Sequence, residues 1–359
     1  MDWDVYCRVV DNHGDLGVCW RLCADLAARN ERVRLWVDDA SALAWMAPQG
    51  AAGVSVHAWP DAKAAAEAAS SHVVVAAFGC ELPDGVLAAM ASAQPAPVWI
   101  NLEYLSAESY VERSHGLPSL QASGPAAGLT QWFFYPGYTD ATGGLLQERD
   151  LSARQNAFDR VAWLACHRIE QREHESIVSL FCYSPQPAFG ALLIALEAQG
   201  AAPSTLLLAA PGAATELMRE HLGPGLAWGR LRGVALPWLC QPDYDHLLWA
   251  SDLNIVRGED SWVRAQWAGR PFLWQAYAQH DGAHRAKLDA FLGRYLAGAQ
   301  TGVQSAVKNA SAIWNGVCAG PLTLPPMDAW RAHAEHWRDA LASRPDLVTQ
   351  LIGFAEARR

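Results

Sequence analysis

The stretch "VYCRVVDNHGDLGVCWRLCADLAA", residues 5–28, decides how the first part of the chain folds. Its run 5–10 is short and largely apolar, as expected of a buried strand. Residues 17–29 repeat apolar side chains at helical spacing, so a strand, a loop and a helix are expected in this order. The loop carries two aspartates, Asp11 and Asp15, where nucleotide-binding folds often have a glycine-rich phosphate loop.

The same alternation continues through the N-terminal half. Strands are expected at 33–39, 54–60, 72–79 and 97–105, with helices near 41–47, 61–69 and 82–93. Strands separated by helical stretches indicate βαβ units and a parallel sheet. From 106 to 150 the pattern stops and Gly, Pro, Tyr and Phe become frequent, which is typical of a functional loop or a lid.

After a helix expected at 151–167, the alternation resumes. The expected strands are 176–183, 205–211, 233–239, 253–258 and 271–277, the helices between and after them are 189–199, 212–221, 243–250, 261–268 and 283–296, and the chain is helical from 304. Two consecutive doubly wound halves with a helical tail predict two Rossmann-like domains facing a cleft. This is the α/β GT-B glycosyltransferase fold, with ligands at the carboxyl ends of the strands.

Composition excludes several classes of protein. The 359 residues carry 37 acids and 27 Lys and Arg residues, a net charge of −10 that would repel duplex nucleic acid. No apolar run reaches membrane-spanning length, and the N-terminus has no signal-peptide features, so a cytoplasmic protein is expected. Cys19 and Cys23 are four apart on one helix, but a second pair of ligands is missing, so no metal is expected.

A second informative stretch is "DLNIVRGEDSWVRAQWAGRPFLWQAY", residues 252–277. A strand ends near Arg257 and a helix is expected to begin with Ser261 as its N-cap, while Glu259 and Asp260 complement the helix dipole. An ordinary capped helix would account for Ser261 alone. Arg257 beside helix N-terminal amides is the combination of donors that a diphosphate needs.

Aromatic side chains follow the first strand of the C-terminal half. Phe181 and Tyr183 are two apart and share one face of that strand. They could be ordinary core residues, or they could stack on a flat base, with Tyr244 completing the stack.

Four motifs together resemble one family. "DNHGDLGVCWRL", "NLEYLSAESYVERSHGLPS", "FFYPGYTDATGGLL" and "VRGEDSWVRAQWAGRPFLWQAY" are similar to the protein-arginine rhamnosyltransferases of elongation factor P, the EarP family, over about residues 5 to 295. The resemblance implies a GT-B fold and inverting transfer of L-rhamnose from dTDP-β-L-rhamnose to one arginine of elongation factor P. It implies no cofactor beyond this donor, and a monomer is expected.

The resemblance also assigns domains and site residues. Residues 1–160 would bind the acceptor and 161–359 the nucleotide sugar, and the last helices could return to the N-terminal domain. The family's aspartates fall on Asp11 and Asp15, and its essential glutamate on Glu259. Its donor-binding residues fall on Phe181, Tyr183, Gln241, Tyr244, Arg257, Asp260, Ser261 and Tyr277.

The sequence departs from the family pattern at a few positions. His13 stands where an aromatic residue is expected between the aspartates, and its role is open. Ala276 and Ala278 replace Ile and Pro, and Tyr244 replaces Phe. These changes affect the fit of the donor and leave the three carboxylates in place.

Arginine chemistry explains why carboxylates follow the first strand. A guanidinium is a poor nucleophile because its lone pairs are delocalised and its pKa lies above about 12. One carboxylate can orient it and another can accept its proton as the C–N bond forms. Asp15 is expected to be the base, Asp11 the orienting group and Glu259 the organiser of the donor loop, although the two aspartates could exchange roles. A simple Asp-Asn turn at Asp11 is the structural alternative.

Other functions fit the same fold. An epimerase, a transferase to a different acceptor, or a non-enzymatic binder of elongation factor P or of a nucleotide would use similar elements. A dinucleotide oxidoreductase would need a G-x-G-x-x-G loop after the first strand, which the sequence lacks. The identity of the sugar rests on the resemblance alone.

Overall fold

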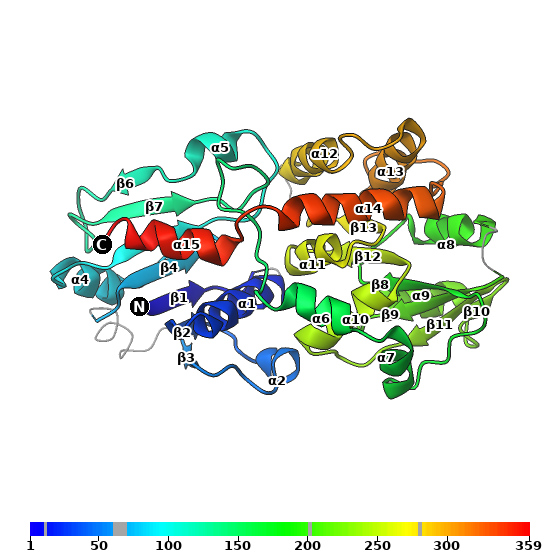
Figure 1. The fold of residues 1–359 in the computed structure, drawn as a ribbon, viewed down its shortest axis with the longest axis horizontal. Helices are drawn as coiled ribbons and strands as arrows, with labels where there is room; N and C mark the ends of the chain where they lie inside the picture. Colours follow the sequence, from blue (N-terminus) through cyan, green and yellow to red (C-terminus); the bar gives the residue numbers. More distant parts are fainter. Residues whose placement is uncertain (11–12, 60–69, 200–202, 279–281) are drawn as a thin grey trace. The chain divides into compact units, whose positions relative to one another are not determined.

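The structure is a computed structural model that describes residues 1–10, 13–59, 70–199, 203–278 and 282–359. The chain divides into two compact units (Figure 1). Unit 1 comprises Met1–Leu151 and Leu341–Arg359, and unit 2 comprises Ser152–Ala340. The division after residue 151 falls earlier than the expected boundary at 160/161, and the C-terminal segment is part of the first unit.

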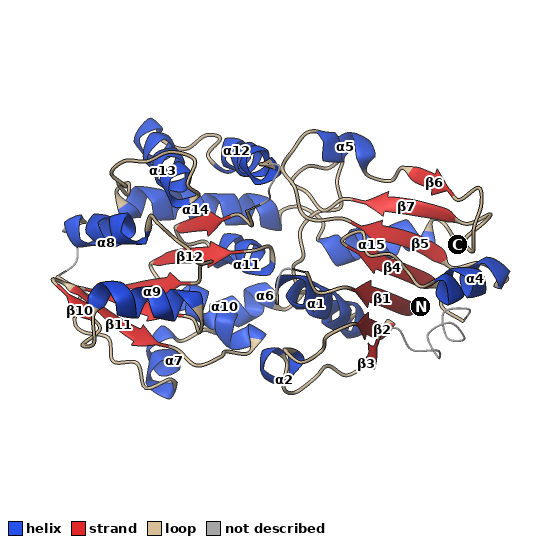
Figure 2. Cartoon of the chain, turned by 180° about the vertical axis from the view of Figure 1, so that it is seen from behind, coloured by secondary structure: helices blue, strands red, loops and turns tan. Residues whose placement is uncertain are grey.

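Unit 1 contains a seven-stranded sheet in the order β3-β2-β1-β4-β5-β7-β6, parallel except for β6 (Figure 2). The strands are β1 (Asp2–Cys7), β2 (Arg32–Val37), β3 (Val54–Ala58), β4 (Val73–Ala77), β5 (Val98–Leu102), β6 (Pro118–Leu120) and β7 (Thr130–Phe134). The helices are α1 (Gly14–Ala28), α2 (Leu43–Met46), α4 (Asp84–Ser92), α5 (Tyr110–Ser114) and α15 (Leu347–Glu356).

Alternating side chains of β1 divide the core of unit 1 between two faces of the sheet. Val5 and Cys7 pack in one cluster with residues of α1 and with Leu351 of α15. Tyr6 points to the other face, where it packs with Met90 of α4. This follows from the period of two along a strand, and it explains why each strand of a sheet covered on both faces is apolar throughout.

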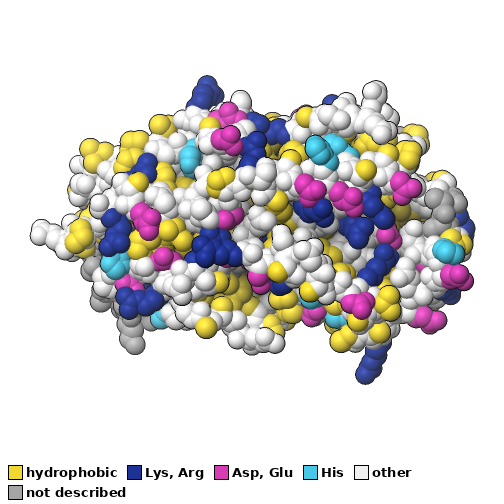
Figure 3. Space-filling model, in the orientation of Figure 1, with side chains coloured by type: hydrophobic (Ala, Val, Ile, Leu, Met, Phe, Trp, Pro, Cys, Tyr) yellow, Lys and Arg dark blue, Asp and Glu magenta, His cyan; other side chains and the backbone are white. Residues whose placement is uncertain are grey.

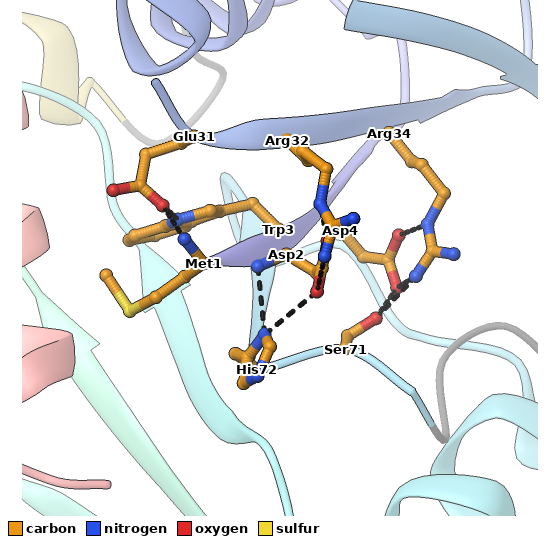
Figure 4. A network of polar contacts seen from close by, with 9 residues as sticks. All are labelled: Met1, Asp2, Trp3, Asp4, Glu31, Arg32, Arg34, Ser71 and His72. Atoms are coloured by element: carbon orange, nitrogen blue, oxygen red, sulfur yellow. Dashed lines mark hydrogen bonds and ion pairs between the residues drawn. The ribbon is translucent and has the colours of Figure 1, made fainter. Parts of the chain in front are cut away.

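A polar network joins strands at the amino end of β1 (Figure 4). The fully buried carboxylate of Asp4 accepts hydrogen bonds from Arg34, from Trp36 Nε1 at 2.9 Å and from Ser71. Asp2 pairs with Arg32 and His72 beside it. Because a buried carboxylate is costly without partners, this network fixes the register of β1 against β2 and the start of β4.

Unit 2 contains a six-stranded sheet in the order β10-β11-β9-β8-β12-β13, parallel except for β10. The strands are β8 (Ser176–Leu180), β9 (Thr205–Ala209), β10 (Ala227–Trp228), β11 (Leu231–Ala235), β12 (Leu253–Arg257) and β13 (Phe272–Gln275). The helices are α7 (Arg160–Cys166), α8 (Phe189–Ala198), α9 (Ala213–Leu222), α10 (Gln241–Ala250), α11 (Asp260–Ala268), α12 (Ala283–Tyr295) and α13 (Thr301–Trp314). Two further helices, α6 (Leu151–Ala157) and α14 (Met327–Ala342), run across the unit boundaries.

Both units repeat the same strand order. Five neighbouring strands run β3-β2-β1-β4-β5 in unit 1 and β11-β9-β8-β12-β13 in unit 2. The direction of winding reverses between β1 and β4 in unit 1 and between β8 and β12 in unit 2, and such switch points are where doubly wound sheets bind ligands. The expected α/β fold with two Rossmann-like halves and a helical C-terminal region is confirmed.

The structure differs from the sequence-based expectation in several segments. The segment 106–150 is not irregular throughout, because β7 pairs with β5 and β6 pairs with β7. The helix expected at 151–167 is two helices, and Asp159 caps the second by accepting from Ala162 N. The helix expected at 61–69 lies outside the described residues.

Charged side chains of both signs lie among one another on the face shown in Figure 3. This face therefore shows no basic stripe of the kind that gathers duplex nucleic acid. Within the described ranges, each helix falls short of the length or the apolar character needed to cross a membrane.

Candidate active site

Asp15 lies in the first turn of α1, at the carboxyl end of β1. Its side chain is nearly inaccessible to solvent, with a relative exposure of 3% for the residue. Oδ2 accepts a hydrogen bond from the backbone N–H of Val10 at 2.8 Å, and Oδ1 accepts one from the hydroxyl of Tyr104 at 3.1 Å. The carboxylate is thus held at the switch point of the first sheet.

Two aromatic residues that sequence reasoning did not assign to the site complete this arrangement. Tyr104 follows β5 and Phe78 follows β4, and their rings stack at 4.3 Å with an interplanar angle of 11°. Both positions come directly after buried strands, and this was the signal that could have identified them. Tyr104 also belongs to one of the motifs on which the family resemblance depends.

A further carboxyl group lies beside these aromatics in the chain. Burial raises the pKa of Glu103, whose Oε1 accepts a hydrogen bond from Asn101 Nδ2 at 2.7 Å. Burial, with Glu103 and Tyr110 nearby, raises the pKa of Tyr135 to about 12. This end of the sheet therefore combines carboxylates with aromatic rings, which suits the recognition of a planar cation.

Two other residues of the loop between β1 and α1 were singled out from the sequence, Asp11 and His13. Asp11 lies outside the described residues. The ring of His13 packs edge-on against Trp45, with 5.3 Å between ring centroids. His13 occupies the N-cap position of α1 without a capping hydrogen bond from its side chain, and its carbonyl accepts the first hydrogen bond of the helix from Gly17 N.

Arg257 lies at the switch point of the second sheet, as the last residue of β12. Its guanidinium carbon lies 4.4 Å from the ring centroid of Phe181 and 4.3 Å from that of Tyr183. Both rings come from the segment after β8, which pairs with β12. Cation–π contact fixes the guanidinium and leaves its N–H groups for an anion.

The contact with Arg257 limits how Phe181 and Tyr183 could stack on a nucleotide base. A nucleotide base would have to use ring surfaces other than those that contact Arg257. The ring of Tyr244 meets Phe181 at 69°, and that of Tyr277 meets Tyr183 at 75°. Four of the predicted aromatic donor residues therefore cluster around or beside Arg257.

The start of α11 corrects the prediction for Ser261. The helix begins at Asp260 with Glu259 at the N-cap position, so Ser261 is not the cap. Its hydroxyl instead donates to the backbone carbonyl of Arg257. The hydrogen bond ties the first turn of the helix to the end of β12. The N-terminus of α11, the end of a helix that favours anions, therefore follows Arg257 closely in the chain.

Glu259 pairs with a cation that sequence reasoning missed. Lys287 Nζ of α12 lies 3.6 Å from Glu259 Oε2. Trp262 and Trp274 stack at 3.8 Å and 3°, and Trp274 Nε1 donates to the carbonyl of Gly258 at 2.9 Å. These contacts fix the loop that carries Glu259 between β12 and α11.

The remaining predicted donor residues lie on neighbouring elements. Gln241 and Tyr244 belong to α10, and burial raises the pKa of the Tyr244 phenol. A buried pair joins α10 to α11, in which Arg264 donates to both carboxylate oxygens of Asp245 at 2.9 and 2.7 Å. Because breaking such a pair is costly, the two helices keep a fixed relation within unit 2.

Metal ligation has no evident location among these groups. Over the ranges that the structure describes, no three His, Cys, Asp or Glu side chains form a group that could hold a metal ion.

Comparison with known proteins adds to this geometry. A family model described as elongation factor P (EF-P) rhamnosyltransferase EarP matches residues 3–356. The chain belongs to the EarP family. A protein-arginine rhamnosyltransferase of Pseudomonas aeruginosa is 41% identical over 98% of both chains, and one of Neisseria meningitidis is 33% identical over 98% of this chain and 96% of its own.

Solved structures agree with the family and the fold. A structure of EarP-mediated arginine glycosylation of translation elongation factor EF-P matches with a TM-score of 0.65 and 30% identity, over 100% of this chain and 99% of that chain. A spinosyn rhamnosyltransferase, SpnG, matches with a TM-score of 0.52 at 13% identity over 98% and 99% of the two chains, which bears on the fold alone. As an EarP family member the chain is an enzyme, a rhamnosyltransferase of the GT-B type that takes a nucleotide-sugar donor.

Proposed function

We propose that this enzyme transfers L-rhamnose from dTDP-β-L-rhamnose to one arginine side chain of elongation factor P, with inversion at the anomeric carbon. The observation that carries the proposal is the family match over residues 3–356, together with relatives named for this activity at 33–41% identity. We assign the reaction to the cytoplasm and to a monomer of this chain.

Unit 2 holds the donor in this proposal. Arg257 and the first amides of α11 bind the diphosphate, because a fixed guanidinium and a helix N-terminus both donate to phosphate oxygens. Gln241, Tyr244, Phe181, Tyr183 and Tyr277 surround the nucleoside. Asp260 and Ser261 lie in the first turn of α11, next to the diphosphate.

Unit 1 holds the acceptor and the base. Asp15 accepts a proton from the arginine guanidinium as its nitrogen attacks the anomeric carbon, and Asp11 orients the same guanidinium. The new C–N bond forms while the bond between the anomeric carbon and the diphosphate oxygen breaks, and dTDP leaves with the electron pair. Attack opposite the leaving group converts the β-configured donor to an α-linked product.

Glu259 has an organising role in this scheme. Its carboxylate is close to Lys287 and at the N-cap of α11. A carboxylate beside a diphosphate would be a poor place to generate further negative charge, so it contacts the sugar or the loop and does not act as the base.

The test is a reconstituted reaction with purified enzyme, elongation factor P and dTDP-β-L-rhamnose. Intact-mass analysis should show a gain of one deoxyhexose on one arginine, and NMR of the product peptide should show the α-anomer. Elongation factor P with that arginine replaced by lysine is the matched control. Donor turnover with no gain on the protein would reject the acceptor, and a β-linked product would reject inversion.

A further inference from the structure

We propose that Tyr104 is a positioning residue that fixes the carboxylate of Asp15 through its hydroxyl, and that Phe78 is the platform that fixes Tyr104. The inference rests on the proposed function of Asp15 and adds two residues to the same site. All three residues lie in unit 1, after the adjacent strands β1, β4 and β5.

The two carboxylate oxygens of Asp15 have partners from distant parts of the sequence. Oδ2 accepts from Val10 N, a backbone group of its own loop. Oδ1 accepts from the hydroxyl of Tyr104, which is 89 positions away in the sequence. A carboxylate held at both oxygens keeps one plane, and a base must meet its proton in a narrow range of geometry.

Stacking on Phe78 fixes the position of the Tyr104 ring. The near-parallel stack of the two rings leaves Tyr104 little freedom to tilt its hydroxyl away from Asp15. Phe78 has a φ of +58°, which is uncommon for a residue with a bulky side chain. Strained backbone of this kind persists where surrounding contacts over-determine it, and it concentrates at functional sites.

Backbone contacts support that conformation. Phe78 N donates to the carbonyl of Leu102 at 2.6 Å, and Gly79 N donates to Asn101 Oδ1 at 3.2 Å. The end of β4 is thus tied to the end of β5, the strand that Tyr104 follows. The ring stack of Phe78 on Tyr104 and the hydrogen bond from Tyr104 to Asp15 are thus held by the same backbone contacts.

The exposure of Tyr104 argues against a purely structural role. The residue is 37% exposed, so its ring contributes little to the core, whereas the carboxylate it contacts is buried. Removing the hydroxyl should therefore change the orientation of Asp15, and the loss of one donor to this buried carboxylate should lower the stability of unit 1 only modestly, because Val10 N still donates to it.

The experiment compares Tyr104→Phe and Phe78→Leu with the wild-type enzyme and with Asp15→Asn. Tyr104→Phe keeps the ring and removes the hydroxyl, so kcat should fall roughly 10- to 100-fold, the scale for a misplaced catalytic group. The KM for dTDP-rhamnose and the affinity for dTDP should stay at wild-type values, and the melting temperature should fall by no more than a few degrees, roughly the shift for one lost hydrogen bond. Phe78→Leu should lower kcat in the same direction, and Phe78→Tyr, which keeps the stack, should restore it.

Tyr6→Phe is the matched control, because Tyr6 also lies in unit 1 but its ring packs with Met90 on the other face of the sheet. Its kcat should equal that of the wild type. Wild-type kcat in Tyr104→Phe together with an inactive Asp15→Asn would overturn the inference and leave the proposed function intact. An active Asp15→Asn variant would overturn the assigned base and this inference together. Hydrogen exchange in β4 and β5 of unit 1 reports on the fold of every variant independently of turnover.

Discussion

Arg29 in α1 and Asp346 at the N-cap of α15 form an ion pair with an N–O distance of 2.6 Å, across 317 positions of sequence. Arg29 also pairs with Asp25 at 2.6 Å and donates to the hydroxyl of Thr349. The side chains of Arg29 and Asp25 are only 2% and 1% exposed. One buried guanidinium thus joins the first helix of unit 1 to the last helix of the chain.

Arg29→Met should destabilise unit 1 by roughly 3–5 kcal/mol, because it leaves the Asp25 carboxylate buried without its partner. Asp346→Asn is the matched variant, since asparagine still caps α15 and only the charge is lost, and it should cost about 1 kcal/mol. Urea unfolding followed by hydrogen exchange in α1 and α15 measures both. Equal and small losses in the two variants would contradict a central role for Arg29.

Arg257 should dominate affinity for the donor nucleotide. Arg257→Ala removes a charge-assisted contact and should weaken dTDP binding by roughly 1.5–3 kcal/mol. Arg257→Lys keeps the charge but loses the planar stack against Phe181 and Tyr183, so it should not restore wild-type affinity. Calorimetry with dTDP checks both. Arg270→Ala, the same change just before β13, is the control and should bind normally; unchanged affinity in Arg257→Ala would remove this residue from the donor site.

Asp15→Asn should bind dTDP normally and lose turnover by about 100-fold or more, the usual scale for a lost base. The amide keeps the shape of the side chain but cannot take a proton from the guanidinium. Asp84→Asn, another acid in the first turn of a unit 1 helix, should keep wild-type turnover. Single-turnover transfer to elongation factor P measures this. If Asp11→Asn is inactive while Asp15→Asn is active, the two roles are exchanged.

Most of the architecture could be predicted from the sequence, because apolar strands and amphipathic helices are recognised from local patterns of hydrophobic residues. Strand β7 was not predicted, because its apolar run "WFF" at 132–134 is followed by Tyr, Pro and Gly residues that favour loops. The sequence reasoning allowed the last helices to return to the N-terminal domain but named no segment, and the structure groups Leu341–Arg359 with unit 1. That relation depends on the pairing of Arg29 with Asp346, and no local pattern encodes a contact across such a separation.

The candidate site was predictable to the same degree. Arg257 at the end of a strand and the helix after it follow from periodicity, because strand ends in doubly wound sheets gather ligands. The contact of its guanidinium with Phe181 and Tyr183 depends on the register between β8 and β12, which sequence does not give. For the same reason the hydrogen bond from Tyr104 to Asp15 becomes visible only when three strands are assembled.

The last prediction concerns His115, which follows α5 in unit 1. Its Nδ1 accepts a hydrogen bond from Tyr135 N at 3.0 Å, and its ring meets Phe134 at 67° with 4.7 Å between centroids. Burial, with Arg358 nearby, lowers the pKa of His115 from its ordinary value of 6.5. Folding therefore favours the neutral form of the His115 imidazole, in which the lone pair of Nδ1 can accept the hydrogen bond from Tyr135 N.

The sign of the pH dependence follows from this shift. Below about pH 6.5 the unfolded chain takes up a proton that folded His115 resists, so unit 1 has its full stability above that pH and loses stability as the pH falls. Asparagine accepts a hydrogen bond and does not titrate, so His115→Asn should reduce the loss of stability between about pH 7.5 and about pH 5.5.

Burial also lowers the pKa of His333 in unit 2, so the measurement must be hydrogen exchange in β7, which belongs to unit 1. His174→Asn changes an exposed histidine and should leave the profile unaltered. An identical acid loss in wild type and His115→Asn would show that another group controls the stability of unit 1.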